Sequence, residues 1–159
     1  MIRRCTDADL ETIHAIINDA AEAYRGVIPP DCWHEPYMSR ADLESEIGAG
    51  VQFWCWQDGD LLAAVMGVQR VRDATLIRHA YVAPSHQRRG LGGELLRHLS
   101  AGATGPLLVG TWADAGWAIR FYERHGFRLV TGDEKNHLLD TYWRIPNRQR
   151  DTSVVLTLD

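Results

Sequence analysis

The sequence lacks a surplus of positive charge. Its 159 residues include 17 lysines and arginines against 21 aspartates and glutamates, which gives a formal net charge of −4. Proteins that bind nucleic acids through their phosphates usually carry the opposite balance. The cluster of Arg144, Arg148 and Arg150 is therefore interpreted as a solvated face, and nucleic acid is not an expected partner.

Cysteine motifs and long hydrophobic runs are also missing. Cys5, Cys32 and Cys55 are scattered and show no C-x-x-C spacing, so we expect reduced thiols and neither a disulfide framework nor a metal site. The longest apolar run, 61–66, is much too short to span a bilayer, and the first residues contain no apolar segment typical of a secretory signal. These absences predict a cytoplasmic protein with no membrane partner.

The residues that are present predict a single mixed α/β domain over 1–159. Hydrophobic residues make up 45% and charged residues 24%, which is typical of globular proteins. Helical spacing of apolar residues indicates a helix from Asp7 to about Tyr24, and Ser39 is placed to cap a second helix that ends near Gly48. The pattern then predicts an antiparallel meander with a turn at Asp58-Gly59, formed by strands at 51–56, 61–71 and 75–82. The remaining predicted elements are a short first strand at 1–5, a helix ending near residue 100, a strand at 107–112, a helix at 117–125, a strand at 127–130, a partly helical segment at 133–142 and a strand at 152–158.

A glycine-rich turn after the third meander strand has the features of an anion site. The segment Gln87-Arg-Arg-Gly-Leu-Gly-Gly93 follows a strand that ends at Pro84 and leads directly into a helix. Glycines let backbone N–H groups face outward, and the start of a helix adds unpaired donors and a positive dipole end. Arg88 and Arg89 add cationic donors. No Gly-Lys-Ser/Thr follows, so the turn is no nucleoside-triphosphate loop, and we predict that it binds a diphosphate.

A second motif, Phe121-Tyr-Glu-Arg-His-Gly-Phe127, follows one helix and one strand later. Together with Val82-x-Pro84 and the Gln87-x-x-Gly-x-Gly pattern, it resembles the GNAT family, the Gcn5-related N-acetyltransferases that use acetyl-coenzyme A. The resemblance extends over nearly the whole chain. It implies a mixed, splayed sheet of six or seven strands flanked by helices, and it is compatible with a homodimer.

The resemblance also implies roles for individual residues. Tyr122 would protonate the leaving thiolate of coenzyme A, and a phenol suits this role because its usual pKa of ~10 keeps it protonated at neutral pH. The alternative is that Tyr122 is a core residue, since it shares a helix face with Ala118 and Ile119. The pantetheine arm would pair with the backbone of Ala80, Tyr81 and Val82. The pyrophosphate would bind to the backbone of Gln87, Arg88, Arg89, Gly90, Leu91, Gly92 and Gly93.

Two positions depart from the family pattern. Ala115 stands where many members have a cofactor-binding asparagine, and Leu76 stands where histone-modifying members have a glutamate base. An attacking ammonium with a pKa of ~10.4 must still lose a proton. His79, on the same predicted strand as Leu76, is the candidate base, because an imidazole titrates near neutrality. Alternatives for this role are His34, Glu35 and Asp114.

The acceptor is expected to be a small-molecule primary amine, with a peptide as the less favoured choice. The irregular stretch 25–38 and its surroundings offer Tyr24, His34 and Tyr37 as acceptor contacts, because long loops often carry function. The alternative is a rigid connector that covers the core. For the whole chain, the alternative to an enzyme is a non-catalytic sensor or regulatory module that binds acyl-coenzyme A. Leu76 and Ala115 favour that module, whereas Tyr122 favours the enzyme.

Overall fold

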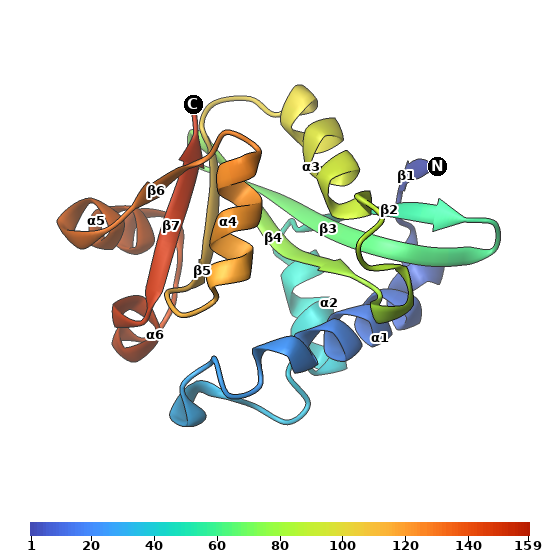
Figure 1. The fold of residues 1–159 in the computed structure, drawn as a ribbon, viewed down its shortest axis with the longest axis horizontal. Coiled ribbons are helices and arrows are strands. Elements are labelled where there is room, and N and C mark those ends of the chain that lie inside the picture. Colours follow the sequence, from blue (N-terminus) through green and yellow to red (C-terminus); the bar gives the residue numbers. More distant parts are fainter.

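A single mixed sheet of seven strands runs through the molecule, and the strand order is β1-β2-β3-β4-β5-β7-β6 (Figure 1). The structure is a computed structural model that describes residues 1–159. This architecture confirms the expected mixed sheet of six or seven strands. The strands are β1 (Ile2–Arg4), β2 (Gln52–Asp58), β3 (Leu61–Val71), β4 (Ala74–Val82), β5 (Leu107–Trp112), β6 (Arg128–Val130) and β7 (Ser153–Leu158).

Helices cover both faces of this sheet. In Figure 1, α3 lies above the central strands, α1 and α2 lie below them, and α4 runs alongside β5. The short helix α6 was not predicted from the sequence. No helix has the length and apolar composition needed to cross a membrane. The α-helices are α1 (Leu10–Ala21), α2 (Arg40–Gly48), α3 (Leu91–Gly102), α4 (Gly116–Arg124), α5 (Gly132–Tyr142) and α6 (Asn147–Asp151); four single turns of 3₁₀ helix are η1 (Asp7–Asp9), η2 (Glu22–Tyr24), η3 (Pro30–Cys32) and η4 (Pro84–His86).

The predicted antiparallel meander is present as β2, β3 and β4. The turn between β2 and β3 uses Gly59 at φ +59°, a conformation that glycine adopts without steric cost. Side chains alternate along β2, so Phe53 and Cys55 pack below with α1, whereas Trp54 and Trp56 pack above with α3. The sheet therefore separates two hydrophobic cores, and its alternation fixes which side chains face each core.

The sheet opens between β4 and β5. These two parallel strands pair only where Thr75–Ile77 lie beside Leu107–Val109. Beyond Ile77, β4 continues along β3 as far as Val82, but its other edge has no strand beside it. Figure 1 shows the two strands diverging from this point. The divergence leaves backbone donors and acceptors of 78–82 without a strand partner on that side.

The open part of β4 also contains a β-bulge. Val65 pairs with Tyr81 and Gly67 pairs with Arg78, so both His79 and Ala80 lie opposite Met66. His79 has a φ of +54°, which is rare for a residue with a bulky side chain. Bulges re-aim side chains, and strained backbone of this kind clusters at functional sites.

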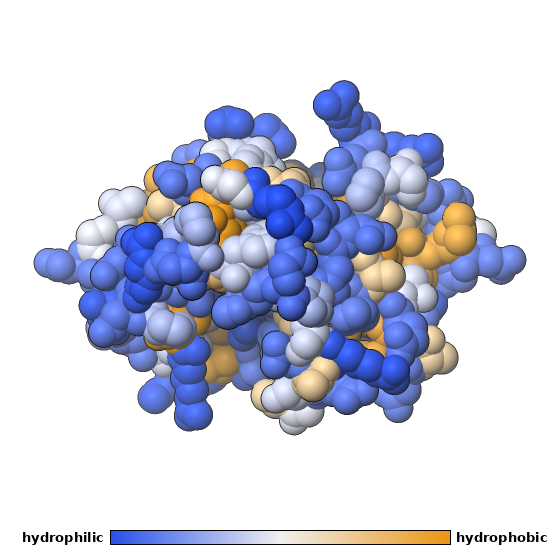
Figure 2. All heavy atoms as spheres, turned by 90° about the horizontal axis from the view of Figure 1, so that it is seen from below, coloured by the Kyte–Doolittle hydropathy of each residue, from blue (hydrophilic) through white to orange (hydrophobic).

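The molecular surface seen from below is largely hydrophilic. Figure 2 shows hydrophobic atoms there only as small, separate patches between charged and polar side chains. The apolar side chains of this side are instead buried between α1, α2 and the sheet, where Ile13, Ile17 and Leu43 are almost fully enclosed.

Candidate active site

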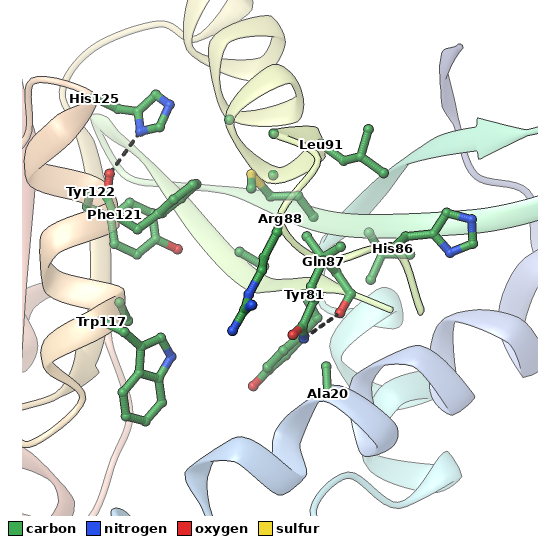
Figure 3. Close-up of a pocket in the computed structure, with 18 of the residues that line it drawn as sticks. Ala20, Tyr81, His86, Gln87, Arg88, Leu91, Trp117, Phe121, Tyr122 and His125 are labelled. Carbon is green, nitrogen blue, oxygen red and sulfur yellow. Dashed lines mark hydrogen bonds between the residues drawn. The ribbon is translucent and has the colours of Figure 1, made fainter. Parts of the chain in front are cut away.

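A cavity of about 740 Å³ lies where β4 separates from β5. We call it the large cavity. Its walls come from the end of α1 and η2, from β4, from the turn before α3 and from α4. Figure 3 shows Trp117, Phe121 and Tyr122 on the α4 side, facing Gln87 and Arg88 on the turn.

The glycine-rich turn forms one end of the large cavity. Gly90 begins α3 at φ +77°, and Arg88 lies in the same left-handed region at φ +67°. Arg89 is exposed and does not line the cavity, unlike the other residues predicted to hold a cofactor. Those that do line it are Ala80, Tyr81, Val82, Gln87, Arg88, Gly90, Leu91, Gly92 and Gly93.

Several basic side chains line the large cavity. Arg97 and Arg124 join Arg88 in its lining, as do His86 and His125. None of these four was predicted as a site residue. Arg124 and His125 lie in the second motif but were given no role, and His86 and Arg97 lie outside both motifs. The site combines the start of a helix, a glycine turn and cationic side chains, which together suit a polyanion such as a diphosphate.

Tyr122 is both a core residue and a lining residue. Its side chain packs against Phe121 and Phe127, with ring centroids 5.0 and 5.5 Å away, and only 6% of the residue is exposed. Burial raises the pKa of Tyr122 well above its ordinary value, so the phenol stays protonated at neutral pH. In Figure 3 its hydroxyl points from α4 into the large cavity. A position in the core is therefore compatible with a hydroxyl that reaches the cavity, as the predicted role of proton donor requires.

A second cavity, of about 170 Å³, adjoins the large cavity, and we call it the inner pocket. Both cavities are lined by Tyr24, Ala80, Tyr81 and Tyr122, so the two spaces meet at these residues. His79 lines the inner pocket only. The remaining walls include the aromatic side chains of Tyr37, Trp112 and Trp143 and the polar side chains of Arg78 and Gln149, together with residues of β5, α5 and β7.

The predicted acceptor contacts are divided between two places. Tyr24 packs against Trp117 with ring centroids 5.1 Å apart, and its burial raises its pKa to about 12. The Tyr81 hydroxyl donates a hydrogen bond of 3.2 Å to the Tyr37 hydroxyl. His34 is exposed and lines a separate space of about 300 Å³, the outer pocket. The outer pocket shares Tyr37, Trp112 and Gln149 with the inner pocket, and Asp42 and Glu46 also line it.

The four candidate bases have different surroundings. Glu35 is exposed and accepts hydrogen bonds from Arg25 and Trp33, at 2.6 and 2.8 Å. Asp114 is exposed and lines none of the three cavities. His79 lies in the inner pocket, as Tyr122 does, while His34 lies in the outer pocket. Geometry therefore brings His79 together with Tyr122 and keeps the other three candidates apart from it.

Glu46 is a neighbour of His79 that the sequence did not indicate. Its Oε1 lies 2.7 Å from His79 Nε2 and 2.8 Å from Arg78 Nη2. Partial burial opposes ionisation of Glu46, but the hydrogen bond and the attraction from His79, together with Arg78, outweigh it and lower its pKa. The carboxylate is thus ionised next to the inner pocket.

Comparison with known proteins gives one family and a group of similar folds. The family of the acetyltransferase (GNAT) domain matches residues 49–129. The ribosomal-protein-S18-alanine N-acetyltransferase of Escherichia coli is 21% identical with a TM-score of 0.71, and the match covers 99% of this chain and 92% of that one. The PaiA N-acetyltransferase of Thermoplasma acidophilum, in complex with coenzyme A, is 17% identical with a TM-score of 0.72, covering 99% and 96%. A GNAT-family acetyltransferase of Staphylococcus aureus is 16% identical with a TM-score of 0.71, again covering 99% and 96%.

Proposed function

The chain belongs to the GNAT family of acetyltransferases, and we propose that it transfers the acetyl group of acetyl-coenzyme A to a primary amine of a small molecule. Membership of the family makes it an acetyl-coenzyme A-dependent acyltransferase; the acceptor and the residue roles are our inference. One observation carries the proposal: the buried phenol of Tyr122 lines both the large cavity and the inner pocket. A proton donor at that junction can serve a leaving group on one side while an amine occupies the other.

We infer that the large cavity holds coenzyme A. The open edge of β4 offers the backbone of Ala80, Tyr81 and Val82 to an extended chain, which can add to it as a strand would. The turn from Gln87 to Gly93 and the nearby arginines suit the phosphates of the cofactor. Acetyl-coenzyme A contributes a thioester, whose carbonyl carbon is the electrophile.

In the proposed reaction, Tyr122 is the general acid. The amine forms a bond to the acetyl carbon, the carbon–sulfur bond breaks, and the Tyr122 hydroxyl gives its proton to the departing sulfur. His79 is the general base and takes the proton that the amine loses. Transfer of a proton from imidazolium to solvent and from solvent to phenolate restores both residues, so the cycle needs no covalent enzyme intermediate.

The inner pocket is the proposed place of the acceptor. Its volume of about 170 Å³ and its enclosure by Tyr24, Tyr37 and Trp112 suit a slender amine better than a bulky one. Aromatic walls provide apolar surface and tolerate a nearby cation through their ring faces. A peptide whose terminal amine enters through the outer pocket, past His34, is the alternative acceptor.

Substitution Tyr122→Phe tests the assignment of the acid. We expect kcat to fall by about 10²- to 10⁴-fold, while coenzyme A affinity measured by calorimetry stays the same, because only the proton is lost. Tyr142→Phe is a matched control, since that hydroxyl bonds Asp73 at 2.5 Å and lines none of the three cavities. Full turnover in Tyr122→Phe would show that another group protonates the thiolate.

A panel of amines tests the function itself. Release of free thiol from acetyl-coenzyme A should depend on an added amine and should be fastest for slender primary amines. If the protein binds coenzyme A but releases no thiol with any amine of a broad panel, it is a binding module for acyl-coenzyme A and the proposed enzyme activity is wrong.

A further inference from the structure

We propose that Glu46, on α2, is a positioning residue that orients His79 and fixes its tautomer for proton abstraction from the acceptor amine. This inference rests on the proposed function, in which His79 is the base. It concerns a carboxylate that is 33 residues away in sequence from the histidine it contacts.

The contact between Glu46 and His79 depends on the β-bulge in β4. Neighbouring residues of a regular strand point to opposite faces, so Arg78 and His79 would ordinarily face different sides of the sheet. The bulge, with its φ of +54° at His79, turns both side chains toward α2. A single oxygen of Glu46 therefore contacts both of them, at 2.8 and 2.7 Å. The strained backbone is what allows this arrangement.

The geometry around the ring leaves one nitrogen free for chemistry. His79 Nε2 faces Glu46 Oε1, and an ionised carboxylate can only accept a hydrogen bond. Nε2 must therefore carry the hydrogen, which leaves Nδ1 with a lone pair. Nδ1 makes no hydrogen bond within the protein, and His79 lines the inner pocket. A ring held in this tautomer can take a proton from an amine through Nδ1.

Further contacts restrict the position of the ring. Phe53 on β2 stacks with it, with centroids 6.1 Å apart and an interplanar angle of 22°. Only 13% of the His79 side chain and 23% of the Glu46 side chain are exposed. The pair is thus shielded enough for its hydrogen bond to hold against competition from water.

Other charged and titratable groups lie near His79. Arg78 carries a fixed positive charge and shares the same carboxylate oxygen. Four phenols share the inner pocket and remain neutral below the alkaline range, because burial raises their pKa values. These phenols are Tyr24, Tyr37, Tyr81 and Tyr122. Asp42 and His34 lie beyond them in the outer pocket.

The kinetic test compares three substitutions. Glu46→Gln keeps an accepting oxygen but removes the charge, Glu46→Ala removes both, and Glu44→Gln changes an exposed carboxylate of the same helix that pairs with Arg40. We expect kcat to fall about 10- to 100-fold in Glu46→Ala and less in Glu46→Gln, with the coenzyme A affinity unchanged. Glu44→Gln should match the wild type.

Two further measurements separate this inference from the proposed function. In ¹⁵N NMR spectra, with the resonances of His79 assigned by the His79→Gln variant, the wild type should show the Nε2–H tautomer and Glu46→Ala a mixture. In addition, Glu46→Ala in a His79→Gln background should cost nothing more in kcat, because its effect passes through the histidine. A wild-type kcat in Glu46→Ala, or an unchanged tautomer, would overturn the inference alone. A wild type that transfers no acetyl group to any amine would overturn the proposed function, and the tautomer would still test the contact.

Discussion

The imidazole of His125 occupies the space that a β-carbon on Gly93 would need. An ideal β-carbon at Gly93 would lie 2.8 Å from His125 Nε2. The ring cannot swing away freely, because His125 Nδ1 also bonds the carbonyl of Phe121 at 2.8 Å (Figure 3). The start of α3 and the end of α4 are thus packed as closely as a glycine permits, and both helices line the large cavity.

Substitution Gly93→Ala should therefore destabilise the protein. The added methyl group forces α3 and α4 apart, and overpacking of this kind costs about 1–3 kcal/mol in the free energy of unfolding. Coenzyme A affinity should fall as well, because the turn and α4 move relative to each other. Urea unfolding and calorimetry measure the two effects.

A control and a rescue accompany this prediction. Gly102→Ala lies on the same helix with open space around its position, so it should leave stability nearly unchanged. The double variant Gly93→Ala/His125→Ala should recover part of the loss. If Gly93→Ala is as stable as Gly102→Ala, the close packing of the two helices is wrong.

Arg88 and its neighbour Arg89 should differ in their effect on coenzyme A binding. Arg88 lines the large cavity, whereas Arg89 does not. We expect Arg88→Gln to weaken coenzyme A binding by about 10- to 100-fold at low salt, because a charge-assisted contact with phosphate is lost. Its affinity should also depend less on salt than that of the wild type, since fewer charges are involved. Arg89→Gln serves as the control, and equal losses in both variants would contradict the assignment.

The ion pair of Arg3 with Asp9 should contribute to stability in a pH-dependent way. Arg3 Nη1 and Nη2 each donate a hydrogen bond of 2.9 Å to the Asp9 carboxylate, and the backbone N–H of Thr6 donates to the same carboxylate at 2.7 Å. The hydrogen bond from Arg3 lowers the pKa of Asp9 to about 2. In an unfolded chain, an aspartate side chain has a pKa of ~3.9. The contribution of ionised Asp9 to folding stability is thus present above about pH 4, and it is lost as the pH falls toward about 2.

Asp9→Asn should lower the free energy of unfolding by about 1 kcal/mol at neutral pH, a modest amount because the pair is partly exposed. The difference from wild type should shrink during acidification and vanish near the pKa of the folded state. Urea unfolding at several pH values measures this, with Asp19→Asn on α1 as a control. A difference that stays constant down to pH ~2 would mean that the stabilisation is not due to the ionised carboxylate.

Local patterns in the sequence were sufficient to predict most of the elements. The meander, the turn at Asp58-Gly59 and the helix closed by Gly126 follow from short-range rules of turns and caps, and all are present. Ser39 accepts a hydrogen bond from the backbone of Asp42, as its capping position predicted. The helix α6 was missed because its five residues are too few to show a hydrophobic period.

Predictions about individual side chains were less complete. Arg88 and Arg89 are equivalent in sequence, but the positive φ of Arg88 helps direct only one of them into the large cavity. His34, predicted to contact the acceptor, lies in the outer pocket, apart from Tyr122. Such differences depend on how a loop packs, which no local pattern records.

The sequence by itself determined the order of the elements, the glycine turn before α3 and the presence of Tyr122 in a helix that follows. Each of these depends on residues a few positions apart, whose backbone preferences act before any packing occurs. Only the tertiary structure decided that β4 and β5 separate after three paired residues, that Tyr122 faces two cavities, and that Glu46 meets His79. All three relationships join residues remote in the chain, so no local preference could set them. The contact of Glu46 with His79 forms only when the bulge in β4 and the packing of α2 bring the two side chains together.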